Sequence, residues 1–106
     1  HFDLEGNWIG VHASNLRLPC SVSILGDNLA VAELKARVTI LDKMGTPISF
    51  LGDNPDEKQW ANFNVPASEQ QLGIFTAPHG LCFDKTGNLY VQDWNKTGRV
   101  TKLSKL

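Results

Sequence analysis

Neither sign of charge is in excess in this 106-residue chain, which has ten Lys and Arg residues against eleven Asp and Glu residues. No basic residues cluster into a stripe, so the electrostatic footprint of a nucleic-acid or anionic-membrane binder is missing. An apolar run of about 18 residues, which a bilayer-spanning helix needs, is also missing. We therefore expect neither nucleic acid nor a membrane among the partners.

The N-terminus lacks the features of a targeting segment. Its first residues, HFDLEGNWIG, have neither the basic flank nor the apolar stretch of a signal peptide. The chain also begins without Met. We expect it to be a processed or excised piece.

Cysteine is scarce, and Cys20 and Cys82 are too few for a disulfide scaffold. Each lies in a strand-like run where a small buried residue fits, which predicts two reduced core thiols. A single bridge between them is the alternative. Asn95-Lys96-Thr97 matches a glycosylation acceptor, but we interpret it as a turn.

The chain repeats itself at a spacing of about sixty residues. Residues 18–43, LPCSVSILGDNLAVAELKARVTILDK, align with residues 77–105, APHGLCFDKTGNLYVQDWNKTGRVTKLSK. The matched positions are Pro19 with Pro78, Asn28-Leu29 with Asn88-Leu89, Val31 with Val91, Glu33 with Asp93, and Arg37-Val38-Thr39 with Arg99-Val100-Thr101. Because an acidic residue and an arginine recur together, we expect a structural ion pair in each unit.

Both units divide into runs with the two-residue period of half-buried strands. Gly, Asp and Asn residues separate the runs and favour tight turns. The expected strands are residues 21–25, 28–33, 37–41 and 46–51 in the first unit and residues 80–84, 88–93 and 99–103 in the second. The second unit therefore lacks a fourth strand.

The N-terminal segment matches this missing strand. Residues 2–12, FDLEGNWIGVH, align with residues 41–51, LDKMGTPISFL. We expect the segment to complete the sheet of the second unit, in the same or a neighbouring copy. The expected divisions are residues 1–12 as an outer strand, 13–52 as the first unit, 53–74 as a long insert and 75–106 as three strands of the second unit.

Four-stranded antiparallel units that repeat in sequence are typical of β-propeller blades. The predicted fold class is therefore all-β, with two four-stranded blades that are out of register at the termini. Two blades cannot close a ring, and they would leave apolar faces and an unpaired edge uncovered. Either the chain is a fragment of a longer propeller, or several copies complete the ring by head-to-tail contacts.

The second unit, PHGLCFDKTGNLYVQDWNKTGRVTKL, resembles the NHL repeat. Pro precedes the first strand, Gly-Asn-Leu-Tyr-Val forms the second, an acidic residue ends it, and Arg-Val opens the third. The first unit has a weaker similarity. The resemblance implies a six-bladed propeller, which three copies of this chain would fill as a homotrimer.

Within that family, the segment FTAPHGLCFD is most similar to the Pro-His segments of peptidyl-α-hydroxyglycine α-amidating lyases. The resemblance implies a zinc ion held by histidines of alternate blades at the channel end of the innermost strands. His79 matches that ligand position. Cys20 occupies the equivalent place in the first unit, where the lyase pattern has a non-ligand.

Each candidate ligand has two interpretations. His79 is either a turn-capping residue or a metal ligand. Cys20 is either a structural thiol or a weaker, soft metal ligand. The lyases also use a tyrosine and an arginine, but the first unit reads AVAELKARVTIL where the tyrosine-bearing turn would lie, and Tyr90 is expected in the core.

No residue is assigned as a general base. The sequence therefore favours a scaffold or binding module that assembles into a six-bladed ring, with zinc at the central channel as the implied cofactor. The chain alone is not expected to be an enzyme. The alternative is a zinc-dependent lyase or hydrolase.

The insert, residues 53–74, has no strand periodicity. Asn54 is expected to cap one short helix and Gly73 to end another. A connection of this length is usually functional or mobile. It is expected either to cover the mouth near His79 as a lid or to pad the blade interface with Trp60 and Phe63.

Overall fold

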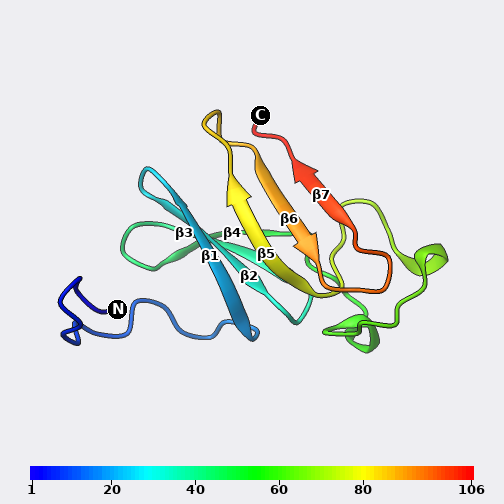
Figure 1. Cartoon of the computed structure of the whole chain (residues 1–106), viewed down its shortest axis with the longest axis horizontal. Coiled ribbons are helices and arrows are strands. Elements are labelled where there is room, and N and C mark those ends of the chain that lie inside the picture. The colour runs from blue at the N-terminus through cyan, green and yellow to red at the C-terminus, as the bar shows by residue number, and fades with distance from the viewer.

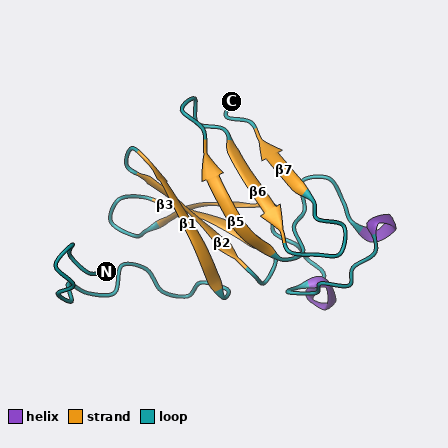
Figure 2. Cartoon of the chain, viewed as in Figure 1, coloured by secondary structure: helices purple, strands orange, loops and turns teal.

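The computed structural model describes residues 1–106 and consists of two antiparallel sheets and two short 3-10 helices (Figure 1, Figure 2). The elements are β1 (Pro19–Leu25), β2 (Asn28–Glu33), β3 (Arg37–Leu41), β4 (Pro47–Leu51), η1 (Glu57–Gln59), η2 (Ala67–Glu69), β5 (Pro78–Phe83), β6 (Leu89–Asp93) and β7 (Val100–Leu103). No helix is long and apolar enough to cross a membrane. The expected all-β class is confirmed, and each strand lies where the alternation predicts it.

Each sheet is a meander in which every strand pairs with the next. The first sheet has the order β1-β2-β3-β4 and the second the order β5-β6-β7. The sheets pack against each other through β5, which contacts β1 and β2 (Figure 1). The edge strands β1 and β5 therefore lie side by side.

The sequence repeat is also a repeat of strand register. Val22 pairs with Val31 in the first sheet, and the matching residues Leu81 and Val91 pair in the second. The next strand keeps the correspondence, because Val31 pairs with Thr39 as Val91 pairs with Thr101. Every residue pair that has a counterpart in the other sheet follows this rule. The second sheet therefore repeats β1 to β3 of the first sheet and has no counterpart of β4.

The core lies between the sheets. It is centred on Ala30, Val38, Phe75, Leu89 and Val91. The first sheet contributes Ala30 from β2 and Val38 from β3, the second contributes Leu89 and Val91 from β6, and Phe75 comes from the segment ahead of β5. Partly buried apolar residues of β3, β4, β5 and β7 pack around this cluster.

Phe75 fixes the connection that leads from the insert into β5. Its side chain is fully buried, and its N–H donates to the carbonyl of Gly52 at 3.0 Å. A Cβ on Gly52 would lie 2.5 Å from the Phe75 ring, and Gly52 has a φ of +58°. Only glycine suits this position, because both the space and the left-handed backbone exclude a side chain.

The insert departs from the expected helices. Asp56 caps η1 by accepting a hydrogen bond from the N–H of Lys58 at 3.0 Å. Asn54 is instead buried, and its amide donates to the carbonyl of Phe75 at 2.8 Å. The second helix, η2, ends before Gly73. The prediction of two short helices holds, but both predicted boundaries are wrong: Asn54 makes a tertiary contact and Asp56 caps η1 in its place, and η2 ends at the C-cap Gln70, three residues before Gly73.

The N-terminal segment forms no strand of the second sheet within this chain. Phe2 instead forms an isolated antiparallel bridge with Trp8. The Asp3 carboxylate between them accepts from the side-chain amide of Asn7 at 2.9 Å and from the N–H groups of Asn7 and Glu5 at 2.8 and 3.0 Å, and these bonds lower the pKa of Asp3. The expected pairing with a strand of the same copy is therefore wrong.

The turn at Asp3 nevertheless has the geometry of the turn between β3 and β4. There, Asp42 accepts from the N–H groups of Met44 and Thr46, both at 2.9 Å. Gly6 and Gly45 have φ angles of +88° and +82° at the same turn position. The alignment of residues 2–12 with 41–51 thus holds at the turn, while the strand that would follow it has no partner.

Candidate functional site

The first strand of each sheet, β1 or β5, begins with a β-bulge. In the first sheet the extra residue is Cys20, between Pro19 and Ser21, and in the second it is His79, the repeat partner of Cys20. A bulge leaves one residue unpaired in the ladder and redirects its side chain. The two residues that the sequence singled out are therefore equivalent in structure, at the edge where β1 and β5 meet.

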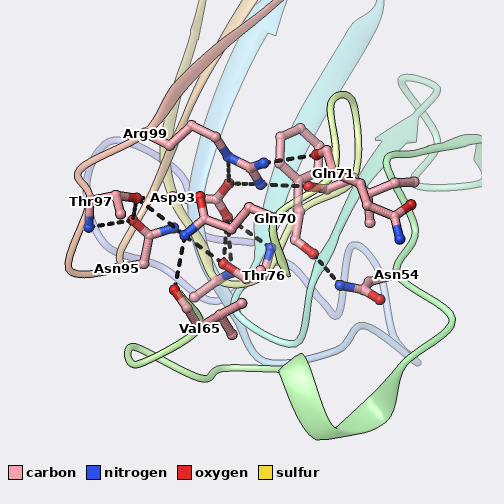
Figure 3. Close-up of polar contacts among 12 residues, drawn as sticks. Asn54, Val65, Gln70, Gln71, Thr76, Asp93, Asn95, Thr97 and Arg99 are labelled. Atoms are coloured by element: carbon pink, nitrogen blue, oxygen red, sulfur yellow. Dashed lines mark hydrogen bonds and ion pairs between the residues drawn. The ribbon is translucent and has the colours of Figure 1, made fainter. Parts of the chain in front are cut away.

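Asp93 fixes the chain that leads to His79, and Figure 3 shows its carboxylate between Thr76 and Arg99. One carboxylate oxygen accepts from the main-chain N–H groups of Thr76 and Ala77 at 3.0 and 2.9 Å. The other accepts from Nε and Nη2 of Arg99 at 3.0 and 2.7 Å. A fully buried carboxylate thus joins β6, the start of β7 and the entry to β5.

Glu33 does the same in the first sheet. Its carboxylate accepts from Nε and Nη2 of Arg37 at 3.2 and 2.8 Å, from the hydroxyl of Thr39, and from the main-chain N–H of Arg17 just ahead of β1. Both expected structural ion pairs are confirmed. None of these four charged side chains is free for catalysis.

His79 is exposed and lies at one end of a row of aromatic rings. Its ring centroid is 5.6 Å from that of Trp94, which is 5.6 Å from that of Phe63. Phe63 belongs to the insert, so the insert reaches the vicinity of His79 through Trp94. Sequence reasoning missed Trp94, although it directly follows Asp93, the residue paired with Pro78.

Cys20 makes contacts across the gap between the sheets. Its Sγ lies 3.3, 3.5 and 3.5 Å from the carbonyl oxygens of Pro78, His79 and Ala32, so its single S–H donates to one of these three at a time. Burial raises the pKa of the Cys20 thiol above its ordinary value. The thiol therefore stays protonated at neutral pH and acts as a hydrogen-bond donor to the main chain at His79.

Both cysteines are free, but neither is the core residue that was expected. Cys82 pairs with Tyr90 on the face of the second sheet that points away from the first. That face has no covering element, which leaves Cys82 exposed. Tyr90 is likewise only partly buried, with the ammonium of Lys102 at 5.7 Å from its ring, so its expected core position is wrong.

No group of three or more His, Cys, Asp or Glu side chains within the chain could hold a metal ion. The structure brings Cys20 to the main chain of His79.

Trp60 anchors the insert. Its indole N–H donates to the carbonyl of Asn54 at 2.8 Å, and the guanidinium of Arg17 lies 4.2 Å from the centre of its ring. Arg17 also forms an ion pair with Asp53 at 2.6 Å. Trp60 therefore packs the insert onto the segment before β1.

No protein-family model and no curated protein matches the chain.

Replacing Asp93 with Ala should lower the free energy of unfolding by about 3–5 kcal/mol, because Arg99 and two main-chain N–H groups lose a buried partner. Urea denaturation at a fixed protein concentration measures this loss. The control is Asp53→Ala, which removes an exposed ion pair with Arg17 and should cost about 1 kcal/mol or less. Equal losses in the two variants would contradict the anchoring role of Asp93.

Cys20 should react with alkylating reagents at higher pH in the folded chain than in the unfolded chain, because burial raises the pKa of its thiol. The stability that the neutral thiol contributes is present below its unfolded pKa and is lost as pH rises through the folded pKa. Mass spectrometry of Cys20 alkylation against pH, with and without urea, measures both profiles. Coincident profiles would disprove the effect of burial.

Proposed function

We propose that the chain is an NHL-like β-propeller module whose two blades join head-to-tail with further copies into a six-bladed ring, where it serves as a scaffold or binding module. The observation that carries the proposal is the way in which the two sheets pack. Their contacting faces are not equivalent in the repeat.

The inward face of the second sheet carries Leu81 and Phe83. Their repeat partners in the first sheet are Val22 and Ile24, which lie on the outward face, 56% and 63% exposed. Conversely, Ser23 lies on the inward face of the first sheet, where its hydroxyl accepts from the N–H of Phe83 at 3.2 Å. Its own repeat partner, Cys82, is on the outward face of the second sheet.

This relation differs from that of a two-fold sandwich. A two-fold axis brings the same face of each repeat together, as in an isologous interface. Here, the first sheet presents outward the face that the second sheet has buried. The outward face of each sheet is thus the complement of the outward face of the other, and head-to-tail addition of copies covers both.

The uncovered surface is large enough for such contacts. The accessible surface is 6678 Å², against roughly 5,900 Å² expected for a monomer of this mass, and the excess of about 800 Å² equals one partner's share of a standard interface. Only 19 of the 106 residues are buried. Exposed apolar side chains lie on the N-terminal segment and on the two outward sheet faces.

Light scattering should give the mass of a trimer, because three two-bladed copies fill a six-bladed ring. Ile24→Glu should reduce the mass to that of a monomer, since it puts a charge on the apolar outward face of the first sheet. The control is Leu72→Glu, which changes an apolar residue that is 98% exposed on the insert and should leave a trimer. A wild-type monomer would contradict self-assembly.

The second candidate is a zinc-dependent lyase or hydrolase. The observation that favours it is the exposed imidazole of His79 in a bulge at the free edge of β5. Each copy provides one such histidine, so a trimer would provide three around its axis. Three imidazoles and an open position suit zinc that polarises a carbonyl or activates water.

Purified wild-type protein should then bind one zinc ion per trimer, and His79→Ala should bind none while it keeps the trimer mass. Equilibrium dialysis with elemental analysis measures the zinc, and light scattering measures the mass. His1→Ala serves as the histidine control. Zinc binding by the His79→Ala trimer would exclude His79 as a ligand.

A further inference from the structure

We infer that the interface between copies repeats, contact for contact, the interface between the two sheets of one chain. This places Cys82 of one copy against Ile24 of the next, and His79 against the main chain of Pro19 and Cys20 of the next. The inference rests on the proposed head-to-tail ring, and it specifies which atoms that ring brings together. The occupant of each outward face is a second copy of this chain.

The first contact follows from Ser23 and Phe83. Within the chain, the N–H of Phe83 donates to the hydroxyl of Ser23 at 3.2 Å. In the repeat, Cys82 stands for Ser23 and Ile24 stands for Phe83, since the two sheets share one register. One further step of the same interface therefore brings the small Cys82 side chain to the main chain of Ile24 of the neighbouring copy.

The outward face of the second sheet has an open hollow at Cys82. It measures about 280 Å³ and is lined by Gly80, Cys82, Tyr90 and Val100, among others. The matching region of the first sheet, around Ala30, receives Phe83 in the core. The exposed Ile24 side chain is the repeat equivalent of Phe83. Ile24 is smaller than Phe83, and the hollow that would receive it is lined by the large Tyr90 where the first sheet has the small Ala30.

The second contact follows from Cys20. Within the chain, its Sγ lies 3.3 and 3.5 Å from the carbonyl oxygens of Pro78 and His79. Since His79 is the repeat partner of Cys20, the His79 ring N–H is expected to donate to the carbonyls of Pro19 and Cys20 of the next copy. His79 thereby becomes a residue of the interface between copies.

Chemical cross-linking tests the first contact. Ile24→Cys is made in a Cys20→Ser background, which keeps a donor of similar size at residue 20 and leaves Cys82 as the other thiol. A short bismaleimide should link copies into covalent dimers and trimers on a denaturing gel. Adding Cys82→Ser should abolish every link.

Ile48→Cys in the same background is the matched control. Ile48 is 57% exposed, like Ile24, but it lies on β4, three strands from β1, which corresponds to roughly 14 Å. It should give no link to Cys82. Links from Ile48→Cys but not from Ile24→Cys in a trimeric protein would overturn the contact map and leave the ring intact.

Two further outcomes separate the inference from the proposed function. Links of Ile24→Cys that survive Cys82→Ser would indicate two-fold packing of first sheets and overturn both. A monomeric wild-type protein without links would also overturn both.

Labelling of native Cys82 provides a test that needs no new cysteine. In the wild-type protein, Cys82 should react with N-ethylmaleimide at least about tenfold more slowly than in Ile24→Glu, because only dissociated copies expose it. Mass spectrometry of the Cys82 peptide measures both rates. Equal rates, with a trimeric wild type and a monomeric variant, would overturn the position of Cys82 in the interface.

Discussion

The buried carboxylate of each sheet, Glu33 in the first and Asp93 in the second, is the interaction on which the rest of the structure depends. A carboxylate without solvent is tolerated only where charge and hydrogen bonds compensate it. Each therefore binds an arginine at or just before the start of the strand that follows it, and a main-chain N–H ahead of the first strand of its sheet. These bonds fix where β1 and β5 enter their sheets, and with that the bulges that carry Cys20 and His79.

Much of this organisation could be predicted from the sequence because it depends on local patterns. Alternation gave the strands, and the recurrence of acid and arginine gave the ion pairs. The bulges were not predictable, since one extra residue at a strand start leaves the alternation unchanged. Burial of Cys82 and Tyr90 was misjudged for another reason: both faces of these strands are rich in apolar residues, and only the packing partner decides which face is covered.

The N-terminal segment also shows that local patterns predict turns, whereas strand pairing depends on the rest of the structure. The Asp3 turn could be recognised because its Asp-x-x-Gly chemistry is local, and it forms in the structure with the hydrogen bonds of the Asp42 turn. The strand after it depends on a pairing partner, and in this structure the segment pairs with no other strand. Asn54 shows the opposite case, where a residue suited to capping a helix is drawn into a tertiary contact with Phe75.

The two roles suggested for His79 are compatible. A metal-binding imidazole ordinarily donates its second ring N–H to a carbonyl or carboxylate, which fixes the tautomer and orients the ring. In the proposed ring, the carbonyls of Pro19 and Cys20 of the next copy would accept that N–H and leave the other nitrogen directed to the axis. Assembly would then orient the ligands, and a ligand bound at the axis would in turn stabilise the assembly, because binding that requires the trimer favours the trimer. The interface and the axial site would therefore depend on the same imidazole.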